Sequence, residues 1–179
     1  MIIWIDGVRG VGKTKVCEEL MNAKINYNFE LLNSDQYYIN MIKRNAFLAL
    51  NTGALPQNNK NFIIEFRNVI KSKIKNEEKN LIIDMALTEK ECKDGLIDSL
   101  KKDGINILHI ILTASKENLI DRIRNDSNRD KEDALNLLEN NLKFLETEFS
   151  QDEWIETDNK CISDIVKEII IIEKRKHKY

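Results

Sequence analysis

Apolar residues in this chain form two kinds of pattern, and the first is a set of short continuous runs. The runs at residues 2–5, 81–84 and 105–113 do not alternate with polar residues, which is typical of parallel strands covered on both faces. Residues 29–33 and 154–159 add a short strand and a strand followed by a turn. The pattern therefore predicts five strands.

The second pattern is a helical period between these runs. Apolar residues recur three or four positions apart in residues 16–21, 62–74, 96–100, 119–123, 135–149 and 162–170. Strands that alternate with helices form parallel sheets with helices on both faces. We therefore expect a three-layer α/β/α fold with a five-stranded, mainly parallel sheet. Residues 1–179 show no repeat or linker, which predicts one domain.

A glycine-rich segment follows the first strand directly. Residues 7–14 fit the pattern G-x-x-x-x-G-K-[ST] at every specified position, a pattern that cradles phosphates with inward-turned backbone amides. Lys13 would reach the β- and γ-phosphates, and the Thr14 hydroxyl would ligate Mg²⁺. We expect an ATP and Mg²⁺ site whose nucleotide-binding residues are Gly7, Val8, Arg9, Gly10, Val11, Gly12, Lys13 and Thr14.

Two carboxylates stand where predicted strands end. Asp84 closes a hydrophobic strand, the pattern by which phosphate-loop proteins hold Mg²⁺, so Thr14 and Asp84 are the candidate metal residues; the alternative is an aspartate that initiates a turn. Asp35 follows the second strand and is a candidate base for a substrate hydroxyl. Alternatively, Ser34 or Asp35 caps the next helix.

Two arginines are further candidates. Arg67 lies in a predicted helix beside Phe66, where it would clamp a substrate or remain a solvated helix residue. Arg129 lies in the short polar segment 125–133. An arginine on a segment that closes over phosphates would neutralise developing charge, whereas an ordinary charged loop is the alternative.

Composition limits the classes of function. The 28 basic and 30 acidic side chains nearly cancel, which argues against a dedicated nucleic-acid binder. Cys17, Cys92 and Cys161 form no C-x-x-C pair, so we expect reduced, mostly buried thiols in a cytoplasmic protein. His109 lies within a predicted strand and is interpreted as a satisfied core histidine. No apolar run is long enough to span a membrane.

The order of these elements resembles the small-molecule and nucleoside-monophosphate kinase branch of phosphate-loop proteins. Residues 121–123 and 128–130 are similar to the arginine segments that flank the lid of adenylate-kinase-like enzymes. The resemblance implies a P-loop NTPase fold of the nucleotide-kinase type, with a substrate-binding insertion at about 36–75 and a lid at about 125–133. It also implies that Arg122 and Arg129 contact phosphate.

A closer resemblance is to the tunicamycin-resistance ATP-binding protein family. It rests on the opening residues 1–5, on segments 112–117 and 156–159, and on the pair Phe66 and Arg67. Two features depart from that family: Asp84 is not expected in all members, and Asn33 stands where an acid is expected.

These observations lead us to expect an ATP-dependent phosphotransferase that acts on a small hydroxylated molecule, with antibiotics and nucleoside-like compounds as candidates. Lys13, Asp35, Arg122 and Arg129 would be catalytic, and Asp35 and Arg67 would contact the substrate. A nucleoside-monophosphate kinase and an ATP-gated protein that sequesters its ligand remain alternatives. The oligomeric state is left open.

Overall fold

The central feature of the fold is one five-stranded parallel sheet. The computed structural model describes residues 1–23, 28–45, 56–126 and 131–176. Within these ranges the strands are β1 (Ile2–Asp6), β2 (Phe29–Asn33), β3 (Asn80–Asp84), β4 (Ile107–Thr113) and β5 (Glu153–Glu156). Their order is β2-β3-β1-β4-β5, and every neighbouring pair is parallel. The predicted α/β fold class is confirmed.

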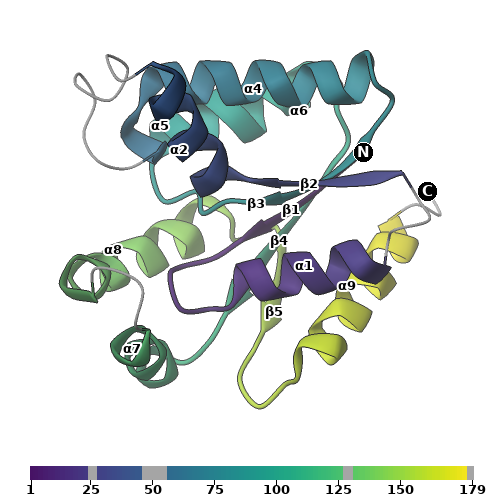
Figure 1. Cartoon of the computed structure of the whole chain (residues 1–179). Helices are drawn as coiled ribbons and strands as arrows, with labels where there is room; N and C mark the ends of the chain where they lie inside the picture. The colour runs from purple at the N-terminus through teal and green to yellow at the C-terminus, as the bar shows by residue number, and fades with distance from the viewer. Residues whose placement is uncertain (24–27, 46–55, 127–130, 177–179) are drawn as a thin grey trace.

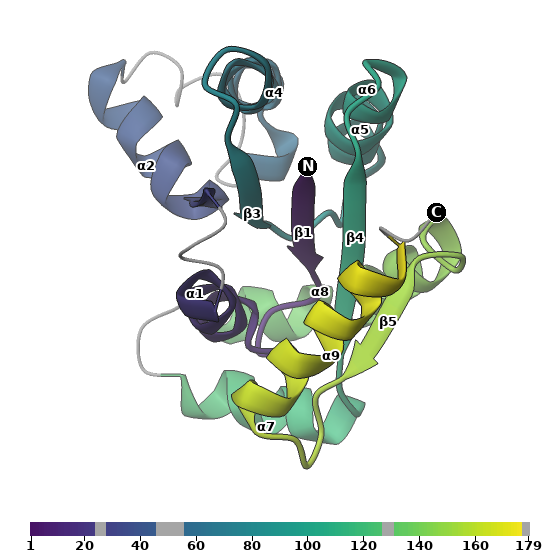
Figure 2. The ribbon, with the colours of Figure 1, turned by 90° about the vertical axis from the view of Figure 1, so that its right-hand side faces the viewer.

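Helices cover both faces of this sheet. They are α1 (Lys13–Ala23), α2 (Ser34–Arg44), η2 (Pro56–Asn58), α4 (Lys60–Lys75), α5 (Lys90–Lys93), η3 (Asp94–Asp98), α6 (Ser99–Lys102), α7 (Lys116–Asn125), α8 (Lys131–Glu148) and α9 (Ile162–Lys176). Helices α4 and α6 lie on one face, and α1 and α9 pack together on the other (Figure 1). Helices α7 and α8 lie beyond the strand ends (Figure 2).

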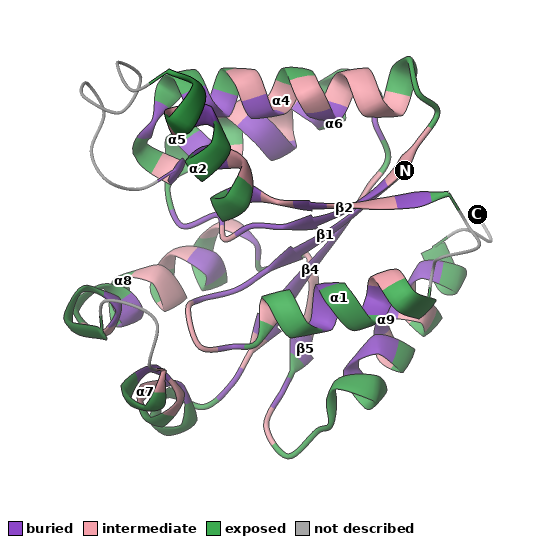
Figure 3. Ribbon diagram, in the orientation of Figure 1, coloured by how far each residue is buried: buried purple, intermediate pink, exposed green. Residues whose placement is uncertain are grey.

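Because helices cover both faces of the sheet, its central strands form the hydrophobic core. Residues 2–5 of β1 and 81–83 of β3 are fully buried, as their continuous apolar runs predict, and Figure 3 shows the burial concentrated in the central strands. On the α4 side, the rings of Phe62 and Phe66 stack at 5.1 Å. The edge of Tyr38 meets Phe62 at 5.4 Å, so an aromatic cluster joins α2 to α4.

Several local features differ from the sequence predictions. The helix predicted at 96–100 is interrupted by η3, a π-helix, between α5 and α6. The fourth strand begins at Ile107 rather than at residue 105. Cys17 and Cys92 are buried as expected, but Cys161 is exposed. Among the described helices, none is long and apolar enough to cross a membrane.

The register brings the ends of the strands to one edge. Asp84 lies opposite both Ile5 of β1 and Asn33 of β2, and Thr113 lies opposite Glu156. The loops that carry the candidate residues therefore begin side by side, at the edge where parallel sheets bind ligands.

The aromatic cluster supplies a test of the fold. Phe66→Ala should lower the free energy of unfolding by about 3–5 kcal/mol, because Phe66 is fully buried and its removal leaves a cavity. Ile64→Ala on the same helix is the control, since Ile64 is 49% exposed, and it should change the free energy by less than about 1 kcal/mol. Urea denaturation measures both, and equal effects would contradict the burial of Phe66 in the cluster that joins α2 to α4.

Candidate functional site

A large open cavity of about 1420 Å³ lies at the carboxyl edge of the sheet. Its walls come from residues 8–16, the start of α2, η2, the segment after β3, helices α7 and α8, and the β5–α9 connection. Residues far apart in the sequence therefore face one space.

The glycine-rich segment at residues 7–14, the predicted phosphate loop, packs tightly on one side and is open on the other. Gly7 and Gly12 have φ angles of +136° and +100°, in the region that favours glycine. A Cβ on Gly7 would lie 2.5 Å from the Leu112 carbonyl oxygen, whereas a Cβ on Gly12 would meet nothing within 4 Å. The empty side at Gly12 faces the cavity and leaves backbone amides accessible to an anion.

The Lys13 side chain folds back onto the loop and is hydrogen-bonded to two of its carbonyl oxygens. Its Nζ donates to the carbonyl oxygens of Gly7 at 2.7 Å and Val8 at 3.2 Å. Desolvation lowers the pKa of Lys13, and the negative charges of Asp84, Asp6 and Asp35 oppose this shift. A phosphate group at this position would favour the charged form for the same reason as these carboxylates do.

Asp84 is the point at which three strand ends meet. Its Oδ2 accepts hydrogen bonds from the Thr14 hydroxyl at 2.8 Å and from Asn33 Nδ2 at 2.7 Å. Asp84 is only 5% exposed. The structure thus brings together the two residues proposed as the metal site, although they are 70 positions apart. A hydroxyl, a carboxylate and phosphate oxygens form the hard oxygen set that Mg²⁺ prefers, so these residues fit that ion.

The start of α2 carries a helix cap, which is Asn33, and a candidate base, which is Asp35. The Asn33 side chain caps α2 by accepting from Gln36 N at 2.9 Å, so neither Ser34 nor Asp35 is the cap. Asp35 is exposed and lines the cavity. Sequence reasoning missed this use of Asn33, although its position at the strand end was the available signal.

The candidate arginines lie in different surroundings. Arg67 is not part of the cavity wall: its Nη1 donates to Gly95 O at 3.3 Å and Ser99 Oγ at 3.1 Å. Arg122 does line the cavity, where it donates to Thr157 Oγ1 at 3.1 Å and Asp158 Oδ1 at 3.2 Å. Arg129 and most of the proposed lid centre lie outside the described residues.

The wall around Asp35 was not foreseen from the sequence. It includes Ser34, Gln57, Asn58 and Thr88, and the Thr88 hydroxyl donates to Gln57 Oε1. These side chains are polar and uncharged, and the arginines and lysines of the cavity wall belong to residues 8–16, to α7 and to the β5–α9 connection. The clue in the sequence is the amide-rich segment beside Pro56.

The comparisons with known proteins agree with this geometry. The family model described as an AAA domain (AAA_18) matches residues 3–156, so the chain belongs to this family. Its fold is that of the P-loop kinases, as the sequence resemblance implied. No curated protein matches the sequence.

Solved structures share the fold at low sequence identity. A tunicamycin resistance protein from Deinococcus radiodurans superposes with a TM-score of 0.72 at 19% identity, covering 94% of this chain and 92% of that one. A sugar kinase from Janibacter sp. HTCC2649 gives 0.67 at 13% identity, with 95% and 92% covered. A gluconokinase from Sinorhizobium meliloti 1021 gives 0.62 at 16%, with 93% and 87% covered. At these identities the similarity shows the fold alone.

Lys13 provides a first test of the site. Lys13→Ala should weaken the binding of MgATP by about 10- to 100-fold, the equivalent of about 1.5–3 kcal/mol for a charge-assisted hydrogen bond. Calorimetric titration measures the affinity. The matched control is Lys102→Ala on α6, an exposed residue outside the cavity wall, and it should bind MgATP as the wild type does.

Removal of magnesium tests Thr14 and Asp84 separately from Lys13. The wild type should bind ATP more tightly with Mg²⁺ than with EDTA, because the ion would join Thr14, Asp84 and the phosphates. Asp84→Asn should abolish most of this gain and leave Mg²⁺-free binding nearly unchanged. A variant that keeps the full magnesium effect would exclude Asp84 from the metal site.

Proposed function

We propose that this protein is an ATP-dependent phosphotransferase whose acceptor is a small, uncharged, hydroxylated molecule. The observation that carries the proposal is the contact between Thr14 and Asp84 at 2.8 Å, beside a phosphate loop and opposite a cavity wall of uncharged polar side chains. Such a site has the two parts a kinase needs, a place for polyphosphate and a place for an acceptor.

Each residue has a defined role in this proposal. The loop amides and Lys13 bind the β- and γ-phosphates of ATP, while Thr14 and Asp84 hold Mg²⁺. When bound, the ion neutralises charge on the phosphate oxygens. Positioning and charge neutralisation provide most of the rate enhancement in phosphoryl transfer.

Asp35 is the proposed base on the acceptor side. The acceptor hydroxyl gives its proton to the Asp35 carboxylate while its oxygen forms a bond to the γ-phosphorus, and the bond to the β-γ bridging oxygen breaks to release ADP. Arg122 and Arg129 remain the proposed lid arginines. Arg67 is left out, because its guanidinium contacts Gly95 and Ser99 instead of the cavity.

The charges on the acceptor side favour an uncharged acceptor over a nucleoside monophosphate. A monophosphate site needs cations, yet Arg44 pairs with Glu65 at 2.8 Å and Arg67 is occupied elsewhere. Neither lines the cavity, and residues 46–55 contain no charged side chain in the sequence. A phosphate near Asp35 would meet a like charge.

The function is tested by turnover with a panel of acceptors. MgATP should give acceptor-dependent ADP release with a sugar, nucleoside or hydroxylated antibiotic, and mass spectrometry should detect the phosphorylated acceptor. Asp35→Asn should lower kcat by about 10²- to 10⁴-fold, the usual contribution of a general base, with little change in MgADP affinity.

The matched control for Asp35→Asn is Asp121→Asn, another exposed carboxylate on the cavity wall, which should retain near-normal turnover. Two outcomes would contradict the proposal. Phosphorylation confined to nucleoside monophosphates would favour the nucleotide kinase. Tight ATP-dependent binding of an acceptor whose mass never changes would favour sequestration.

A further inference from the structure

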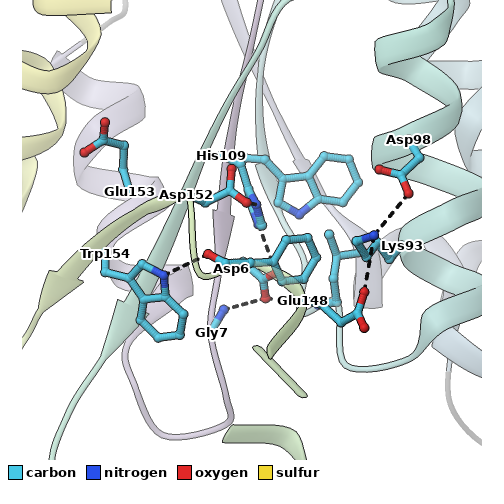
Figure 4. Close-up of polar contacts among 12 residues, drawn as sticks. Asp6, Gly7, Lys93, Asp98, His109, Glu148, Asp152, Glu153 and Trp154 are labelled. Atoms are coloured by element: carbon cyan, nitrogen blue, oxygen red, sulfur yellow. Dashed lines mark hydrogen bonds and ion pairs between the residues drawn. The ribbon is translucent and has the colours of Figure 1, made fainter. Parts of the chain in front are cut away.

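A buried group of charged side chains lies behind the phosphate loop, outside the cavity (Figure 4). Asp6 ends β1 and is 0% exposed, and His109 on β4 is 2% exposed. Neither residue lines the cavity, so any effect of this pair on a bound nucleotide must pass through another group.

The carboxylate of Asp6 joins three segments of the chain. Its Oδ1 accepts from the backbone N–H of Gly7 at 2.5 Å and from that of Leu87 at 3.0 Å. Its Oδ2 lies 3.0 Å from His109 Nε2. Gly7 begins the phosphate loop, and Leu87 follows the segment that carries Asp84. Asp6 therefore fixes the spacing between the phosphate side and the metal side of the site.

His109 lies between two carboxylates. On its other side, Nδ1 is 3.5 Å from Asp152 Oδ2 and has no hydrogen-bond partner among the described residues. A neutral imidazole that donates from Nε2 to Asp6 would turn the Nδ1 lone pair toward Asp152, whereas an imidazolium turns an N–H toward it. The carboxylate oxygens of Asp6 and Asp152 on either side of the ring therefore favour the charged form of His109.

The charged side chains near His109 also favour its protonated form. Burial lowers the pKa of His109, but Asp152 and Asp6 outweigh it, so the pKa is raised above its ordinary value. Phe149 packs edge-on against the ring at 4.6 Å. Lys101 and Lys176 act on Asp152, and the Cys92 thiol near Asp6 stays neutral because burial raises its pKa.

We propose that Asp6 and His109 are positioning residues for nucleotide binding, with His109 fixing the carboxylate that holds the Gly7 and Leu87 amides in place. This inference rests on the nucleotide-binding part of the proposed function and not on phosphoryl transfer. A charged His109 also accounts for the burial of an acid directly before the glycine-rich loop, because a neutral histidine would leave the Asp6 carboxylate without charge compensation.

The sign of the pH dependence follows from the raised pKa. A histidine whose pKa is higher in the folded state than its unfolded value of about 6.5 contributes stability that is fully present below that value. The contribution is lost as the pH rises through the folded-state pKa. The anchoring of Gly7 should therefore weaken as the pH rises through the raised pKa of His109.

Binding of MgADP by charge-neutralising variants tests the proposal. His109→Gln leaves the buried Asp6 carboxylate without a cation and should weaken MgADP binding by about 10-fold, by analogy with the lower range for the loss of an outer-shell partner around a metal site. Adding Asp6→Asn neutralises the carboxylate but keeps an oxygen for both amides, and should recover most of the loss. Calorimetry is performed at a temperature where each variant is folded.

The control variant is Trp154→Phe, which removes a hydrogen bond to the Phe149 carbonyl in the same cluster without touching Asp6, and it should bind MgADP normally. A folded His109→Gln protein that binds like the wild type, or a double variant with additive losses, would overturn the proposal. If the wild type itself fails to bind MgADP, the proposed function fails instead.

A second measurement, NMR of the histidine side chains, tests the charge of His109 without a substitution at Asp6, His109 or Asp152. The chain has two histidines, His109 and His177, so imidazole NMR signals are assigned with His177→Gln. His109 should remain an imidazolium at a pH above the ordinary histidine value of about 6.5. A His109 signal that titrates at or below the ordinary value of about 6.5 would overturn the charged pair.

Discussion

The parallel register of β2, β3 and β1 is the constraint on which the site depends. Asn33 and Ile5 both lie opposite Asp84, so the segments that follow these strands leave the sheet at the same level. Side chains alternate along a strand, and a slip of one residue would turn Asp84 to the other face of the sheet. Its contacts with Thr14 and Asn33 would then be lost. The glycine-rich motif alone does not create the site.

The electrostatics of the site form two layers. Asp6 lies behind the phosphate loop, outside the cavity, and is fully buried, whereas Asp84 is nearly buried but lines the cavity together with Thr14 and Lys13. The carboxylates oppose the desolvation of Lys13 and, through Asp6, hold the loop backbone. Because Asp6 lies outside the cavity, it supports the loop conformation without presenting its charge to an incoming polyphosphate, whereas Asp84 faces the cavity as a candidate metal residue.

The sequence predicted the parts of the site that depend on local pattern. The loop at residues 7–14 and Asp84 at a strand end were recognisable because a short run of residue types sets their geometry. The use of Asn33 as both helix cap and Asp84 partner was not, since an acid was expected there. The contacts of Arg67 depend on a π-helix, whose irregular period no apolar stripe indicates. His109 resembled a core residue, because its partner Asp6 is 103 positions away.

The two ends of the cavity differ in how their specificity is built. The nucleotide end uses backbone amides and residues next to strand ends, which the register of the sheet holds in place. The end near Asp35 uses Gln57 and Asn58 of η2 and Thr88 after β3, which lie in short connections between larger elements. Connections can change their side chains without altering the sheet. The acceptor is therefore the property of this protein that the fold constrains least, and the uncharged side chains beside Asp35 are the features from which it must be inferred.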